Sequence, residues 1–327
     1  MTAGGRGLLP VYRGLPTRNV RYATSTLFRE LPGSIPPGEF CYAGAMSAYQ
    51  AEVPTRSDGR DSDLAALIEE AETWSGGSDR LLMPYLTDRA ASALPARLAS
   101  RLVLESVEAW SPAGVSTLSD LLAALPRKQR HNAQRNLRQF DRSGLIAGVE
   151  PLGVCIAEFA LLAEAASRKH GQQDESSALN RHLKAIADSF GADAVVFTAR
   201  GKDAALAGAV LAVRHGDELF IRMTGFDEER TRGSAAYFNL MYYLPLDETL
   251  DRSPRAVHYG VGSLVTKLRQ GAELSPLWTL LPVDLTPDEH AAVHHRRLAG
   301  LTADAPESLL HRITGLFEAG RDRRGGA

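Results

Sequence analysis

Three short apolar segments that follow one another with only a few polar residues between them constrain the fold of this chain most. They cover residues 194–199, 206–214 and 218–224, and the turns between them contain Gly201 and Gly216. Connections this short join antiparallel strands that are neighbours in the sheet. The pattern therefore predicts an antiparallel β-meander in the second half of the chain.

Further elements are expected on both sides of this meander. Apolar residues at helical spacing predict two amphipathic helices before it, at 157–169 and 176–190. After it we expect a helix from Ser234 to about Thr249 and a strand over 256–259. A short helix over 263–270 and an apolar strand over 276–281 complete the predicted order. Helices and strands mixed in this way predict an α+β fold.

The first half of the chain gives weaker signals. Residues 1–40 are rich in glycine, proline and arginine and are expected to be loop, with a short strand at 19–23. Beyond them the patterns favour helices at 63–74 and 90–98 and strands at 80–86 and 101–110. The residues from Thr286 onward predict a polar helical tail. No repeat of 20–50 residues is visible.

Charge and cysteine content narrow the functional classes. Lys and Arg number 37 against 39 Asp and Glu, so a generally basic nucleic-acid-binding protein is excluded. Two cysteines cannot build a disulfide scaffold or a four-cysteine zinc site and fit a reducing compartment. No apolar run reaches the ~20 residues of a membrane span, and no signal peptide is apparent, so we expect a cytoplasmic protein.

One predicted helix, over 127–142, is locally very basic. It begins after Pro126 and ends at Gly144, and Ala133, Leu137 and Phe140 form a narrow apolar stripe. A solvated helix face is one interpretation, and contact with phosphate groups is the other. The candidate phosphate-binding residues are Arg127, Lys128, Arg130, Arg135, Arg138 and Arg142.

A second candidate phosphate site lies where the meander gives way to the next predicted helix. Backbone N–H groups are unpaired at the start of a helix, and the helix dipole is positive there. Gly233 permits close approach of an anion, and two arginines add bidentate donors. The candidate residues are Arg230, Arg232, Gly233, Ser234 and Ala235.

The order of helix pair, meander, R-x-x-G-x-A loop, strand, helix and strand over about 155–283 resembles the GNAT acyltransferases. In that superfamily a Q/R-x-x-G-x-G/A loop binds the pyrophosphate of coenzyme A, and Arg230, Gly233 and Ala235 occupy the motif positions. The resemblance implies a mixed, mostly antiparallel sheet flanked by helices.

Two further stretches, 125–144 and 258–278, resemble large bacterial GNAT-like proteins with two such domains, which include the Fem-type aminoacyltransferases. This likeness implies two tandem GNAT-like domains. Residues 1–150 would form a degenerate domain without a phosphate loop, 151–285 the acyltransferase domain, and 286–327 a helical tail.

The same likeness suggests catalytic residues near the next-to-last strand, beside the expected position of the donor carbonyl. Lys267 would stabilise oxyanion charge, and Tyr259 would protonate a leaving group. Ser263 lies four residues before Lys267 and is expected on the same helix face. The alternative is a surface Lys267 and a Tyr259 half-buried in the core. Asp227, Glu228 or a water chain are guesses for a general base.

The leading hypothesis is an N-acyltransferase that moves an acyl or aminoacyl group onto an amine of a small molecule or peptide. Acyl-CoA is slightly favoured as donor. Aminoacyl-tRNA, as in Fem-like cell-wall or specialised-metabolite biosynthesis, is the alternative donor. A non-catalytic nucleic-acid-binding or interaction protein is a further alternative.

No metal is expected, because His290 and His294 lack a third ligand and His295 lies on the same polar stretch.

Overall fold

The structure, a computed structural model, describes residues 7–14, 22–28, 30–31, 39–45, 50–51, 61–77, 80–169, 175–247, 253–303, 311 and 314–315. The chain divides into two compact units, which are Met1–Glu108 with Leu274–Ala327, and Ala109–Glu273. This division differs from the domain boundaries predicted at 150 and 285. The basic helix belongs to the second unit, whereas Leu274–Ala327 is grouped with Met1–Glu108 in the first.

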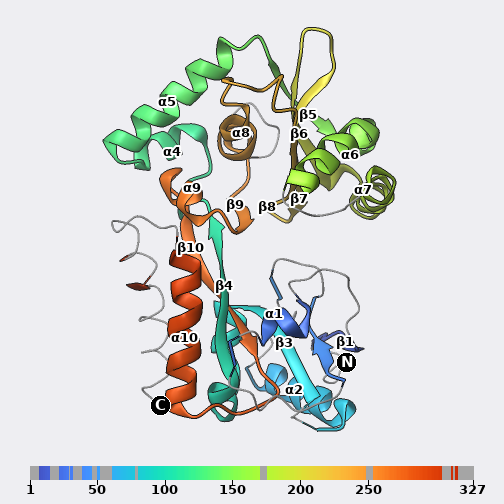
Figure 1. Ribbon diagram of the computed structural model, residues 1–327, viewed down its shortest axis with the longest axis vertical. Helices are drawn as coiled ribbons and strands as arrows, with labels where there is room; N and C mark the ends of the chain where they lie inside the picture. Colours follow the sequence, from blue (N-terminus) through green and yellow to red (C-terminus); the bar gives the residue numbers. More distant parts are fainter. Residues whose placement is uncertain are drawn as a thin grey trace. The chain divides into compact units, whose positions relative to one another are not determined.

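The second unit contains the predicted meander (Figure 1). Strands β6 (Ala194–Arg200), β7 (Leu206–His215) and β8 (Glu218–Phe226) pair antiparallel in sequence order. Strand β5 (Ile146–Pro151) pairs antiparallel with β6 and forms the edge, so the order within this unit is β9-β8-β7-β6-β5. The sequence analysis missed β5, whose side chains are mostly exposed and therefore lack the alternation of a half-buried strand.

Strands β8 and β9 (Ala256–Val261) separate along their length. Their parallel register covers only three pairs, from Glu218–Ala256 to Phe220–His258, although β8 continues to Phe226. The helix predicted from Ser234 is shorter and less regular than expected. It consists of α8 (Ala236–Phe238), a π-helical turn over Asn239–Tyr243 and a 3-10 turn over Leu244–Leu246. Pro245 cannot donate a helical hydrogen bond and explains this end.

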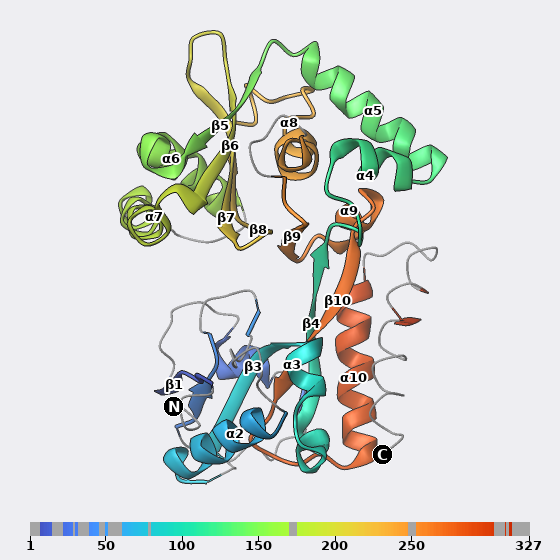
Figure 2. The ribbon, with the colours of Figure 1, turned by 180° about the vertical axis from the view of Figure 1, so that it is seen from behind.

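Helices cover both faces of the second unit's sheet. Helices α6 (Leu152–Lys169) and α7 (Ser176–Phe190) lie on one face, and α8 lies on the other (Figures 1 and 2). Phe159, Leu183, Val196 and Leu211 belong to the buried core under α6 and α7. Both helices predicted from the apolar spacing are confirmed, and α6 begins earlier than expected.

The contact between α6 and β8 depends on Gly225. A Cβ atom at this position would lie 2.7 Å from Leu162 Cβ and 2.8 Å from the backbone nitrogen of Ala163. We expect Gly225→Ala to destabilise the protein by about 1–3 kcal/mol, because helix and strand must move apart. Urea denaturation measures this loss. Gly153→Ala in helix α6 is the control, because a Cβ atom at Gly153 would meet nothing within 4 Å. Equal stability of the Gly225→Ala and Gly153→Ala variants would contradict the close contact at Gly225.

An ion-pair network ties β5, β6 and α6 together. The Arg200 guanidinium lies 2.7 Å from a Glu150 carboxylate oxygen and 3.0 Å from one of Glu158. Hydrogen bonds from Arg200 lower the pKa of both carboxyls below the ordinary value of 4.5. Groups with a depressed folded-state pKa stabilise the fold above the unfolded pKa and lose this contribution as pH falls through the folded pKa.

We therefore expect the free energy of unfolding to fall as pH drops below about 4.5. In Arg200→Gln this dependence should become shallower, which urea denaturation at pH 7 and pH 4 measures. An unchanged pH dependence in the variant would show that other carboxyls govern acid unfolding.

Two consecutive helices precede the meander. Helix α4 (Leu118–Ala124) begins at a capping box formed by Thr117 and Asp120. Helix α5 (Arg127–Asp141) is the predicted basic helix, and it buries Ala133, Asn136 and Phe140 as its inner face. Asn136 Nδ2 donates to the Tyr243 hydroxyl at 3.2 Å. Helix α5 is thereby fixed against the turn that continues α8.

The first unit contains its own strands, in the order β1-β2-β3-β10-β4. A buried Arg297 lies 2.6 Å from Glu105 and donates to the carbonyl of Leu27, which stabilises this core. Residues 22 and 23 of the strand predicted at 19–23 do not form a strand. Residues 19–21 lie outside the described part of the chain. The bounds are β1 Val11–Arg13, α1 Thr24–Leu27, β2 Cys41–Ala43, α2 Asp61–Ser75, β3 Leu81–Thr87, α3 Asp88–Ser92, a 3-10 turn Ala96–Arg101, β4 Leu102–Trp110, β10 Glu273–Leu280 and α10 Pro287–Thr302.

Among the helices that the structure describes, none combines the length and apolar character needed to cross a membrane. The fold class is confirmed as α+β, with a mostly antiparallel sheet flanked by helices. The GNAT-like nature of residues 1–150 stays a prediction.

Candidate functional site

The loop between β8 and α8 is held in one conformation by its own hydrogen bonds. Asp227 Oδ1 accepts hydrogen bonds from the backbone N–H groups of Glu229 and Arg230, each at 3.0 Å. Ser234 Oγ donates to the Thr231 carbonyl and accepts from the Ala236 N–H. The loop shape therefore depends on side chains that the R-x-x-G-x-A pattern does not specify.

Two residues of this loop adopt left-handed backbone conformations. Gly233 has φ +72° and Ala235 has φ +57°, and the second value is uncommon for a residue with a side chain. The backbone N–H groups of Gly233 and Ala235 donate to no acceptor within the part of the chain that the structure describes. Free N–H groups on a fixed loop at a helix start suit an anion.

The loop and the end of α5 enclose a cavity of about 720 Å³, which we call the arginine cavity. Its lining contains five arginines and no acidic residue, so it favours an anionic ligand. Gln139 on α5 donates to the Gly233 carbonyl and joins its two walls. The lining residues are Arg135, Arg138, Gln139, Arg142, Ser143, Arg230, Arg232, Gly233 and Ser234.

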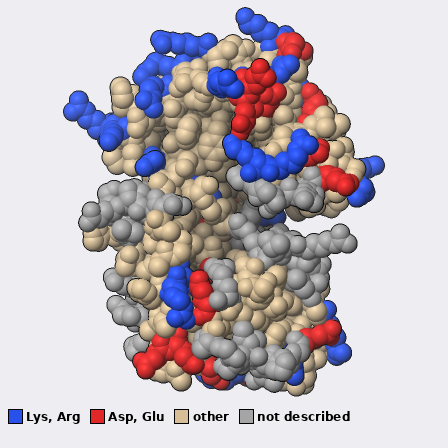
Figure 3. Space-filling model, in the orientation of Figure 1, with Lys and Arg blue, Asp and Glu red and all other residues tan. Residues whose placement is uncertain are grey.

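The structure thus brings together the two candidate phosphate sites of the sequence analysis. Arg135, Arg138 and Arg142 are exposed and form no ion pair or side-chain hydrogen bond among the described residues. Arg232 is also exposed, and its charge helps to lower the pKa of the Glu228 carboxyl. Figure 3 shows the Lys and Arg side chains gathered along α5. Unpaired like charges held close together repel each other, so a bound polyanion would stabilise this arrangement.

Arg230 differs from the other four arginines of this cavity. Its guanidinium lies 2.9 Å from the Asp203 carboxylate and 3.6 Å from that of Asp227. The hydrogen bonds from Arg230 lower the pKa of the Asp203 carboxyl. Arg230 therefore attaches the loop to the β6–β7 turn, in addition to lining the cavity.

Three of the predicted phosphate-binding residues lie elsewhere on α5. Arg130 donates to the carbonyls of Ala123 and Leu125, so it caps the C-terminus of α4. Arg127 and Lys128 are exposed in the first turn of α5 and do not line the arginine cavity. The basic helix is thus divided along its length into an end at the cavity and an end away from it.

The predicted catalytic residues occupy the end of β9 and helix α9 (Leu264–Arg269). Lys267 is 3% exposed, and its Nζ donates to the carbonyls of Gly260 at 2.7 Å and Val261 at 3.2 Å. The alternative interpretation of Lys267 as a surface residue is therefore wrong. Ser263 is exposed with φ +48° and is the N-cap of α9, whereas Lys267 is buried.

Tyr259 is buried against the ring of Tyr242, with 4.9 Å between ring centroids. Burial raises the pKa of the Tyr259 hydroxyl well above its ordinary value, so the group stays protonated at neutral pH. Tyr259, Ser263 and Lys267 line neither of the two cavities described here. Their catalytic role stays a prediction.

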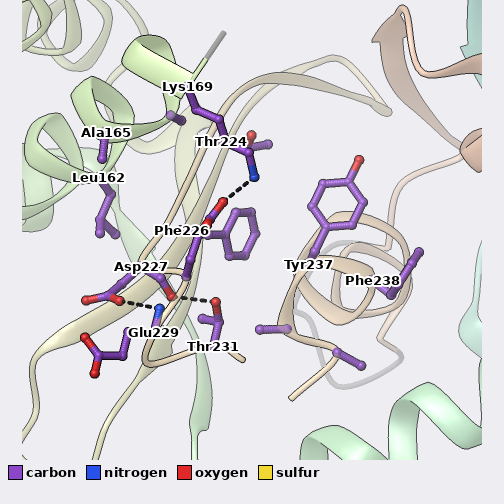
Figure 4. A pocket seen from close by; sticks show the side chains of 14 residues that line it. Leu162, Ala165, Lys169, Thr224, Phe226, Asp227, Glu229, Thr231, Tyr237 and Phe238 are labelled. Carbon is purple, nitrogen blue, oxygen red and sulfur yellow. Dashed lines mark hydrogen bonds and ion pairs between the residues drawn. The ribbon is translucent and has the colours of Figure 1, made fainter. Parts of the chain in front are cut away.

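A second cavity, of about 850 Å³, lies between α6, the end of β8 and the start of α8 (Figure 4). We call it the aromatic cavity, because Phe226, Tyr237 and Phe238 contribute to its wall. The suggested bases Asp227 and Glu228 line it, together with Glu229. The sequence analysis missed its apolar residues, since their helical and strand spacing is that of an ordinary core.

Other candidates have structural roles. His290 Nε2 lies 2.7 Å from the Leu102 carbonyl, and no group of three potential metal-ligating side chains occurs among the described residues. Cys155 is buried, and burial raises the pKa of its thiol to about 11.

Comparison with known proteins identifies the second unit. Residues 127–267 match the family model described as Acetyltransferase (GNAT) domain. This range includes α5, the meander, the loop at 227–235 and Lys267. No curated protein sequence matches the chain.

Solved structures share the fold at low sequence identity. L-PGS from Bacillus licheniformis is 10% identical with a TM-score of 0.55, and the alignment covers 90% of this chain and 87% of that one. The C-terminal domain of a proposed lysylphosphatidylglycerol synthetase from Agrobacterium fabrum is 12% identical (TM-score 0.53; coverage 80% and 83%). A conserved protein of unknown function from Bacteroides thetaiotaomicron is 14% identical (TM-score 0.52; coverage 75% and 80%).

Residues 127–267 are therefore similar to a GNAT acetyltransferase domain. The resemblance seen in the sequence is confirmed, and the findings support acyl transfer in general.

Proposed function

We propose that this protein is an N-acyltransferase that binds the phosphate groups of an acyl-CoA donor in the arginine cavity. The observation that carries the proposal is the convergence of Arg135, Arg138 and Arg142 with the free N–H group of Gly233 in one cavity. Coenzyme A carries a pyrophosphate and a further phosphate, which match a compact cavity with several bidentate donors.

In the proposed reaction the acceptor amine, after losing a proton to water, attacks the acyl carbon of the donor thioester. The C–N bond forms, the C–S bond breaks, and the leaving thiolate takes up the proton that the attacking nitrogen loses as it becomes an amide. Proximity and orientation supply much of the rate in such a transfer. The chain's own contribution would be to hold the donor by its phosphates while the acyl end reaches the acceptor.

Calorimetric titration with coenzyme A and acetyl-CoA tests this donor. We expect micromolar affinity in the wild type and a loss of about tenfold for Arg232→Ala, which removes one charge-assisted contact. Absence of binding at millimolar ligand would refute the acyl-CoA proposal.

Aminoacyl-tRNA is the second candidate donor, and one observation favours it. Arg127 and Lys128 extend the basic surface of α5 beyond the arginine cavity and have no partner among the described residues. A polyanion that follows the helix would contact both ends, and its affinity would fall steeply with salt. Arg127→Ala/Lys128→Ala should weaken tRNA binding and leave coenzyme A binding unchanged, so this variant separates the two donors.

A further inference from the structure

The loop at 227–235 separates two cavities of opposite charge. Thr231 and Ala235 line the aromatic cavity, whereas Arg232 and Gly233 line the arginine cavity. The two cavities therefore share this loop as a wall, and the acyl arm of a donor held by its phosphates would have to extend past the loop to reach a ligand in the aromatic cavity. This placement makes the aromatic cavity a candidate for the acceptor.

Apolar side chains form much of the wall of the aromatic cavity. Leu162 and Ala165 come from α6, and Phe226 and Tyr237 come from the strand end and α8 (Figure 4). The rings of Phe226 and Tyr237 meet edge to face with 5.7 Å between centroids. Aromatic faces attract cations as well as apolar groups.

Three consecutive carboxylates, Asp227, Glu228 and Glu229, border the same cavity with a single lysine, Lys169. The Asp227 carboxylate already accepts a hydrogen bond from the backbone N–H of Glu229, and Glu228 forms an ion pair with Lys169. An ammonium group of the protein itself thus already lies at this rim. Glu229 is exposed, and its carboxylate forms no hydrogen bond or ion pair among the described residues, although it interacts electrostatically with Arg230 beside it.

Building on the proposed function, we propose that the acceptor bound in the aromatic cavity is a cationic amine carried on an apolar body, without a carboxylate beside the amine. The apolar body would contact Phe226 and Tyr237, and the ammonium would be attracted by Glu229. A free α-amino acid fits worse, because its own carboxylate would lie among like charges.

Three ligands that share one ring test this proposal directly, without any donor. They are phenethylamine, phenylalanine and 3-phenylpropionate, and their affinities are measured by ligand-observed NMR titration. We expect phenethylamine to bind about tenfold more tightly than phenylalanine, and 3-phenylpropionate not to bind. Equal affinity for the three would overturn the proposal.

Variants then locate the binding. Glu229→Gln should weaken phenethylamine binding about threefold to tenfold, whereas Glu70→Gln, an exposed glutamate on α2 without a partner among the described residues, should not. Ala165→Trp should fill the cavity and abolish binding, and Ala178→Trp on the exposed face of α7 is its control. Undiminished binding in both Glu229→Gln and Ala165→Trp would place the amine elsewhere.

A coenzyme A titration of the same variants keeps the two proposals apart. Glu229→Gln and Ala165→Trp should bind coenzyme A as the wild type does. If the amine binds in the aromatic cavity and coenzyme A does not bind, only the proposal of an acyl-CoA donor is refuted. If coenzyme A binds and the amine does not bind selectively, only the proposed acceptor is refuted.

Discussion

Replacing Arg138 and Arg142 together with alanine is expected to lower the affinity for coenzyme A by about a hundredfold or more, while the free energy of unfolding stays unchanged or rises slightly. Each arginine offers a charge-assisted contact worth about 1.5–3 kcal/mol, and every 1.4 kcal/mol changes affinity tenfold. Both side chains are exposed and have no partner among the described residues, so removing them relieves repulsion between like charges. Calorimetry and urea denaturation measure the two effects.

The matched control removes two charges from the other end of the same helix. Arg127→Ala/Lys128→Ala should change the affinity for coenzyme A by less than about threefold, because salt screens charges that lie more than a Debye length away. If the two double variants lost affinity equally, the basic helix would act through its overall charge and the arginine cavity would not be the binding site.

Replacing Lys267 with methionine is expected to destabilise the protein by about 2–4 kcal/mol. The substitution removes a buried ammonium that donates to two backbone carbonyls, Gly260 and Val261, and leaves these carbonyls without that donor. The end of β9, which has already separated from β8, would lose its attachment to α9.

Arg269→Met is the control for this substitution, because Arg269 is exposed on the same helix and has no partner among the described residues. It should change stability by less than about 0.5 kcal/mol in urea denaturation. A Lys267→Met variant as stable as the wild type but without acyltransferase activity would instead support the catalytic role suggested by the sequence.

The local pattern of the chain predicted the secondary structure of the second unit well. Turns containing Gly201 and Gly216 leave no room for a crossover, so they determine that β6, β7 and β8 pair as neighbours. The apolar stripe of Ala133 and Phe140 correctly indicated which face of α5 is buried. Strand β5 was missed, because an exposed edge strand does not show the alternation on which such predictions depend.

The site could be predicted only in pieces. Gln139 and Gly233 lie 94 residues apart in sequence, and no local signal indicates that they share a hydrogen bond. The burial of Lys267 could not be predicted from the sequence either, because helical spacing assigns a residue to a helix face and does not say what covers that face. The division of the basic helix into two ends likewise depends on tertiary packing, through Asn136 and Tyr243.

The central claim is that the arginine cavity holds the phosphate groups of the donor. A crystal structure of the wild-type protein with coenzyme A at millimolar concentration tests it most directly. We predict electron density for the pyrophosphate within hydrogen-bonding distance of Arg138, Arg142 and the Gly233 N–H. Density for these phosphates in the aromatic cavity, or a site without ligand under these conditions, would contradict the claim.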